Sequence, residues 1–154
     1  MGLPTVMFIR TETDKRAAIH EAAHAAAAVV LGLPVRKVTI EDGSYLDRGH
    51  YTPAHDCGDE CLCIMALAGI EGERLFFAGK DDDDYFGDSI DLDMVRRILR
   101  PRTEMEFIAE VARLRAAARR LVLSQRANIA RIAHALLDTG TLSGDQVIAL
   151  IANR

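Results

Sequence analysis

The 154-residue sequence has little of what marks disordered, disulfide-rich or membrane-spanning chains. It contains only four prolines and eleven glycines, and 49% of its residues are hydrophobic, so wholesale disorder is excluded and one core can form. Its three cysteines form one odd-numbered cluster, which is not a disulfide framework. Its apolar runs, residues 25–33 among them, are much shorter than the roughly 20 residues that span a bilayer.

An excess of positive charge is also missing. The 19 basic residues are outnumbered by 23 acidic ones, so no nucleic-acid partner is expected. The N-terminus lacks the basic segment, long apolar core and cleavage site of a signal peptide, and we expect a soluble cytoplasmic protein without a membrane span. One basic stretch is predicted to be a solvated helix face or a subunit contact. It contains Arg113, Arg115, Arg119 and Arg120.

The remaining pattern predicts a mainly α-helical chain. A first helix is expected from residue 13 or 14 to residue 31, where Gly32 ends it. Ser89 is a suitable N-cap for a short helix, and Thr103 with Glu106 forms a capping-box pattern for a long one. The further helices are expected at residues 59–78, 89–99, 103 to 124 or 125, 126–138 and 143–152.

Strand signals are confined to one short region. Val35, Val38 and Ile40 lie in a β-favouring stretch that ends at a turn signal, residues 41–44. A second strand around residues 48–52 would return from this turn and form a small β-hairpin. We therefore expect a single α+β domain over residues 1–154, mainly helical with a small hairpin or sheet.

His20, Glu21 and His24 form the sequence HExxH inside the first predicted helix. Residues four apart lie on the same helix face, so both imidazoles can hold one Zn²⁺. Zinc can lower the pKa of a water towards ~7, and Glu21 is the candidate general base. The alternative is a helix that happens to carry two hydrogen-bonded histidines, and the well-delimited helix around the motif argues against it.

A catalytic zinc site needs a third protein ligand, and spacing alone leaves it open. Two glutamates lie on one predicted helix with side chains that point apart, so only one of them can face the zinc. Three aspartates lie at the start of another helix, where the helix dipole also favours negative charge. The candidates are Glu71, Glu73, Asp88, Asp91 and Asp93.

Several further stretches accompany the HExxH motif. In chain order they are HEAAH at residues 20–24, RKVTI at 36–40, LAG through Phe77 at 67–77, GDSIDL at 87–92, and the tail from LL to TLSGD at 136–145. In order and spacing they resemble the peptidase domain of the FtsH-type ATP-dependent zinc metalloproteases, over nearly the whole chain. One departure is Ala23, where the family usually has glycine.

The resemblance implies roles for further residues. The family's third zinc ligand is an aspartate after a Gly-x-Ser-x pattern, which corresponds to Asp91 here. Glu73 corresponds to a glutamate near the metal, which would orient a ligating histidine. Such proteases hold substrate as an extended strand against an exposed sheet edge, which makes Val38, Thr39 and Ile40 substrate-binding candidates. An ordinary half-buried strand is the alternative for these three residues.

The implied activity is zinc-dependent endopeptidase cleavage, with one Zn²⁺ per chain. The sequence has no Gly-x-x-x-x-Gly-Lys-Ser/Thr loop for phosphate, so we expect a peptidase without its own ATPase, acting on peptides or unfolded segments. The alternatives are a non-catalytic zinc-containing binding or adaptor module and a peptidase subunit of a separately encoded ATPase. A homo-oligomer is compatible with each. The metal site and β element fall in residues 1–102, and residues 103–154 form the C-terminal helical part.

The cysteine cluster offers a second, weaker metal site. Cys57, Cys61 and Cys63 lie near His50 and His55, but their spacing is not that of a CxxC pair. Free cysteine commonly behaves as a small buried hydrophobe, so burial is favoured over metal binding.

Overall fold

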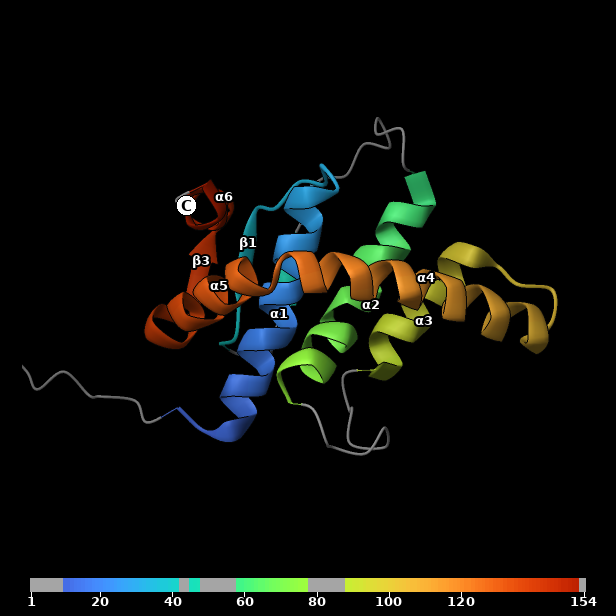
Figure 1. The fold of residues 1–154 in the computed structure, drawn as a ribbon, viewed down its shortest axis with the longest axis horizontal. Helices are drawn as coiled ribbons and strands as arrows, with labels where there is room; N and C mark the ends of the chain where they lie inside the picture. The colour runs from blue at the N-terminus through green and yellow to red at the C-terminus, as the bar shows by residue number, and fades with distance from the viewer. Residues whose placement is uncertain (1–9, 42–44, 48–57, 78–87, 153–154) are drawn as a thin grey trace, which may run out of the picture.

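The computed structural model describes residues 10–41, 45–47, 58–77 and 88–152, and the fold within these ranges is mainly helical (Figure 1). Six helices and three short strands follow one another along these ranges. They are α1 (Glu12–Val30), β1 (Lys37–Thr39), β2 (Tyr45–Asp47), α2 (Gly58–Phe76), α3 (Asp88–Leu99), α4 (Glu104–Ser124), α5 (Arg126–Thr139), β3 (Thr141–Ser143) and α6 (Gly144–Ala152).

Helix α1 is the centre of the fold. Every residue of the stretch 18–28 is buried, because α2 packs on one side of it and α5 on another. The stretch is rich in alanine, whose small side chain allows neighbouring helices to approach closely. In Figure 1, α4 and α5 cross α1 and α2, and α3 lies beside α2. The HExxH motif thus lies in the part of α1 where every residue is buried.

The helix ends largely follow the expected capping signals. Thr11 caps α1, accepting a hydrogen bond from the Asp14 amide while the Asp14 carboxylate accepts one from the Thr11 amide. This cap places the helix start at residue 12 rather than 13 or 14. Thr103 caps α4 as predicted. By contrast, α3 already begins at Asp88, so Ser89 lies in its first turn and is not the N-cap.

The sheet has three strands in the order β2–β1–β3, and both pairings are antiparallel. Val38 is opposite Leu46 on one side and Leu142 on the other. Strand β3 was not predicted from the sequence, and β2 lies at residues 45–47, before the expected range 48–52, which falls outside the described residues. Gly144 allows β3 to reach β1, because a Cβ there would lie only 1.8 Å from the Val35 carbonyl oxygen.

The central position of β1 corrects one expectation. Val38, Thr39 and Ile40 were predicted to offer a sheet edge to a substrate strand, but β2 and β3 already pair with the two sides of β1. Val38 and Thr39 are buried, and the Ile40 amide donates to the Gly140 carbonyl. The strand therefore has a structural role in this fold, and its edge is closed to a peptide.

None of the helices in the described part of the chain is long and apolar enough to cross a membrane. The cysteine expectation is corrected in one respect. Cys61 is disulfide-bonded and so cannot offer a thiolate to a metal, whereas Cys63 is a buried free thiol. Burial and nearby carboxylates raise the pKa of Cys63 to about 11, which keeps this thiol protonated. Cys57, His50, His55 and the acidic run at residues 81–84 lie outside the described residues.

Candidate metal centre

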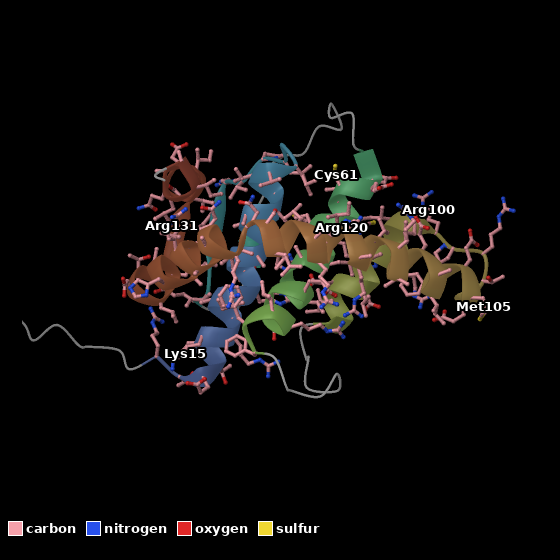
Figure 2. All side chains as sticks on the ribbon, in the orientation of Figure 1. Lys15, Cys61, Arg100, Met105, Arg120 and Arg131 are labelled. Atoms are coloured by element: carbon pink, nitrogen blue, oxygen red, sulfur yellow. The ribbon has the colours of Figure 1, made fainter. Side chains whose placement is uncertain are left out.

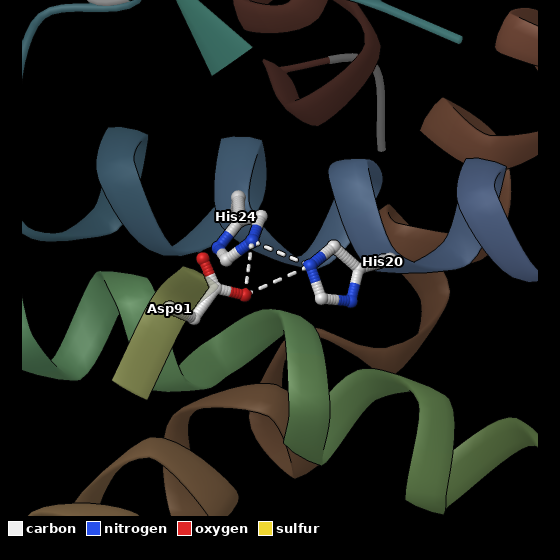
Figure 3. Close-up of side chains that lie close together, drawn as sticks. All are labelled: His20, His24 and Asp91. Carbon is white, nitrogen blue, oxygen red and sulfur yellow. Dashed lines mark hydrogen bonds and ion pairs between the residues drawn. The ribbon is translucent and has the colours of Figure 1, made fainter. Parts of the chain in front are cut away.

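The two histidines of HExxH lie one turn apart on α1 and face the same point. His20 is 8% exposed and His24 is 6% exposed, and their Nε2 atoms are 2.9 Å apart. Asp91, from α3, approaches the same point with Oδ2 at 3.0 Å from His20 Nε2 and 3.4 Å from His24 Nε2 (Figure 3). Helices distant in the sequence therefore bring two nitrogen atoms and one carboxylate oxygen together.

Hydrogen bonds on the far side of each ring direct the Nε2 atoms inward. His24 Nδ1–H donates to the Met65 carbonyl oxygen at 2.8 Å, and because a carbonyl can only accept, Nδ1 must carry the proton. His20 Nδ1–H donates to Glu73 Oε1 at 2.6 Å. In the neutral tautomers that result, both Nε2 atoms present lone pairs to the same point, as metal-ligating histidines do.

The meeting point is electron-rich and largely shielded from water. Asp91 Oδ2 is a buried atom that accepts no well-aligned hydrogen bond from the described residues. Two lone pairs and a carboxylate oxygen at such distances repel one another unless a cation lies between them. Without a metal, a proton on the His20 imidazole supplies the positive charge. Burial lowers the pKa of His20, but Asp91 and Glu73 outweigh burial and raise this pKa to about 10. Burial would raise the pKa of Asp91, but the two imidazoles hold it well below its usual range.

The donor set fits a divalent metal ion. The three candidate ligand atoms all lie within 4.8 Å of one another, and two imidazoles with one carboxylate are a common protein ligand set for zinc. Gly69 of α2 keeps space open beside them. A Cβ at this position would lie 2.5 Å from His24 Nε2 and 2.7 Å from His20 Nε2. Even the smallest side chain would thus take up the space next to both nitrogen atoms.

A second layer of charge holds His20 in place. Glu73, 6% exposed, accepts from His20 with one carboxylate oxygen and from Arg16 Nε and Nη2 with the other, at 3.1 and 2.9 Å. Burial would raise the pKa of Glu73, but His20 and Arg16 outweigh it and lower the pKa. Arg16 lies one turn before His20 on α1, so the three side chains form a short chain of charge-assisted hydrogen bonds.

The structure separates the five acidic candidates. Asp91 alone of them lies beside both Nε2 atoms among the described side chains, while Glu73 contacts the far side of His20. Glu71 pairs instead with Arg115 of α4 at 2.8 Å, so the two glutamates have different partners. Asp93 is exposed, and the side chain of Asp88 lies outside the described part. Glu21, the candidate general base, is 4% exposed and directly follows His20.

Sequence reasoning missed Arg16, Gly69 and the Met65 carbonyl. A signal for Gly69 was present, because glycine inside a helix costs roughly 1 kcal/mol relative to alanine and marks a close approach. Gly72 belongs to the same pattern, since a Cβ there would lie 2.6 Å from Ala23 Cβ. No comparable sequence signal singles out Arg16, whose partner is 57 residues away.

Gly69→Ala is expected to lower metal affinity more than it lowers stability, because the added methyl intrudes beside both Nε2 atoms. Gly72→Ala is the matched control: it also crowds the α1–α2 contact, costing about 1–3 kcal/mol of unfolding free energy, but faces Ala23 instead of the histidines. Zinc titration of both folded variants checks this. Equal zinc affinity in the two variants would show that Gly69 matters only for packing.

Glu73→Gln is expected to weaken zinc binding by about 10- to 100-fold, since the neutral amide is a poorer hydrogen-bond partner for the His20 ring and removes the carboxylate charge that faces Arg16. Glu71→Gln serves as control, because Glu71 is equally buried on the same helix but pairs with Arg115. The measurement is competition for zinc against a chelator of known affinity. A matching loss in the control would assign the effect to general destabilisation.

Neither a scan against protein-family models nor a search of curated proteins finds a match to this chain.

Proposed function

We propose that this chain is a zinc-dependent metalloendopeptidase of the FtsH-peptidase type, with His20, His24 and Asp91 as the ligands of one Zn²⁺. The observation that carries the proposal is the convergence of His20 Nε2, His24 Nε2 and Asp91 Oδ2 on one point, with Glu21 directly following His20. The order of sequence motifs supports the same assignment. A histidine pair retained only for packing would not need both rings turned inward towards a buried carboxylate oxygen.

Each residue of the centre then has a defined task. Zinc, when bound, supplies the Lewis acidity that lowers the pKa of a water and polarises a peptide carbonyl. Glu21 accepts the proton of the attacking water on its carboxylate and returns it to the leaving amine, so that no strong base is released. Glu73 and Arg16 keep the His20 ring in its ligating orientation. Asp91 contributes the negative charge that offsets part of the ion's charge.

The proposed substrates are peptides and unfolded protein segments. Since β1 is paired on both sides, a substrate strand cannot be placed along Val38–Ile40, and peptide recognition must use other surfaces. The hydrolytic step is the same in a peptidase that works alone and in one that receives unfolded chains from a separately encoded ATPase. The proposal covers both cases because its tests concern only the hydrolytic step.

The proposal is tested by removing and restoring the metal. Protein stripped with a chelator should leave a library of unstructured peptides intact, and one equivalent of Zn²⁺ should restore cleavage. Mass spectrometry of the digest identifies the new termini. Zinc bound at one per chain without cleavage of any peptide would contradict the proposal and favour a non-catalytic zinc-containing binding module.

A further inference from the structure

Helix α4 carries an exposed apolar stripe that no described residue covers. Met105 is 76% exposed, Ile108 55% and Leu123 50%, although all three are large hydrophobic residues. Their spacing in the sequence brings them to one side of the helix, opposite the side buried in the core. Exposed alanines fill the stripe between them. They are Ala109, Ala112 and Ala116.

The charges on α4 are divided between its two halves. Its N-terminal half carries the acidic residues Glu104, Glu106 and Glu110, and its C-terminal half carries most of the arginines. Arg119 and Arg120 are exposed and make no ion pair with any described residue. Figure 2 shows Met105 at one end of α4 and Arg120 further along towards α5. Two copies of such a helix packed antiparallel are complementary in charge, because the acidic half of each lies beside the basic half of the other.

We propose that α4 is the interface of a homodimer, in which the α4 stripes of two copies pack antiparallel about a two-fold axis. This inference goes beyond the proposed peptidase activity and does not depend on it. With the axis between Ala112 and Ala116, the small side chains meet at the centre and allow close approach. Leu123 of each copy then lies opposite Met105 of the other. Glu106 lies near Arg120 of the second copy, and this pair occurs twice.

A hollow beside the stripe completes the fit. The hollow has a volume of about 470 Å³ and lies at the junction between α4 and α5. The residues that line it include Leu123, Phe76, Arg126 and Ala127. In the antiparallel arrangement Met105 of the second copy is placed at this hollow. A flexible thioether side chain suits such an irregular apolar space. The most exposed large side chain of the α4 stripe thereby gains a binding place on the other copy.

The charge pattern favours a second copy over a nucleic acid. A strand of phosphates would gain from the arginines but would be repelled by the three glutamates on the same helix. An antiparallel copy of α4 uses both halves. It also covers apolar side chains that phosphates would leave in water.

A charge-exchange experiment tests the proposal on the full chain. Sedimentation equilibrium of the wild type at 10–100 μM should give twice the monomer mass of 16.9 kDa. In a dimer of the Arg120→Glu variant, the new glutamate lies near Glu106 of the other copy, so two acidic side chains meet at each end of the interface. In a dimer of the Glu106→Arg variant, the new arginine lies near Arg120 of the other copy, so two basic side chains meet there. Each variant alone should raise the dissociation constant of the dimer at least ~10-fold. An equimolar mixture should restore the dimer, because each opposing pair is again of opposite sign.

The controls make every outcome decisive. Arg97→Glu makes the same charge change at an exposed residue of α3, outside the stripe, and should leave the dimer intact. Circular dichroism of each variant checks that the helices remain folded. A wild type that stays monomeric throughout, variants that dimerise as well as the wild type, or a mixture of the two variants that stays monomeric would each overturn the proposal.

Discussion

Glu21→Gln is expected to lower kcat/KM for peptide cleavage by about 100- to 10,000-fold while leaving one zinc bound per chain. The amide has nearly the same shape as the carboxylate but cannot accept the proton of the attacking water. Glu21 is 4% exposed and lies between the two histidines in the sequence, so an isosteric change there preserves the packing of α1. Steady-state cleavage of a fluorogenic peptide, with zinc content measured on the same sample, checks both parts.

Glu12→Gln is the control for this prediction, because Glu12 lies on the exposed first turn of the same helix and pairs with Lys15. Its activity should match the wild type. If Glu21→Gln cleaved peptides at the wild-type rate, Glu21 would not be the general base. If the variant lost zinc as well, the loss of activity would say nothing about proton transfer, and Glu21 would instead have to be counted among the residues that hold the metal.

Asp91→Asn is expected to lower zinc affinity by at least ~100-fold. This loss is larger than the usual effect of mutating a residue that only hydrogen-bonds to a metal ligand, because Asp91 is itself a proposed ligand. Asp91 supplies the only carboxylate oxygen that the described residues place beside both Nε2 atoms. The neutral amide removes the negative charge that attracts the ion. Competition against a chelator of known affinity measures the change, and cleavage activity should fall with zinc occupancy.

Asp93→Asn provides the matched control for Asp91→Asn. Asp93 lies two residues further along α3 and is exposed, so it shares the helix and the sequence context without facing the histidines. Its zinc affinity should equal that of the wild type. Equal affinities in the wild type and both variants would remove Asp91 from the ligand set and would leave a centre of two histidines alone.

The local part of the candidate site could be predicted from the sequence. HExxH lies on a helix with clear start and stop signals, and helical geometry alone turns His20 and His24 to the same side. The alanine-rich surroundings predicted close packing, and α1 is indeed buried along most of its length. The same kind of local signal correctly placed Thr103 as the cap of α4.

The parts of the site that come from distant segments depend on how the helices pack, which no local sequence signal indicates. Spacing left five acidic residues open as the third ligand, and the resemblance to a family, not the spacing, favoured Asp91. Which carboxylate reaches Nε2 depends on how α2 and α3 lie against α1, and Gly69 and Gly72 set part of that distance. The chain from Arg16 through Glu73 to His20 depends on the same packing.

The sheet shows the same limit. A hairpin was expected because only neighbouring residues entered that prediction, and the resemblance to a family implied that β1 has an exposed edge. Residues 141–143 form β3 when α5 returns the chain to β1, about one hundred residues away in the sequence. Thr141 and Thr39 then share a hydrogen bond between their hydroxyls at 2.8 Å. This third strand is what closes the edge that had been assigned to substrate.

Anomalous diffraction at the zinc absorption edge, from crystals of the protein grown with one equivalent of Zn²⁺, tests the central claim most directly. We predict one strong peak per chain, within about 2.0–2.2 Å of His20 Nε2, His24 Nε2 and an Asp91 carboxylate oxygen. Glu73 should remain hydrogen-bonded to His20 Nδ1. A chain with no peak between these three side chains, or with its zinc held elsewhere, would contradict the assignment of this centre.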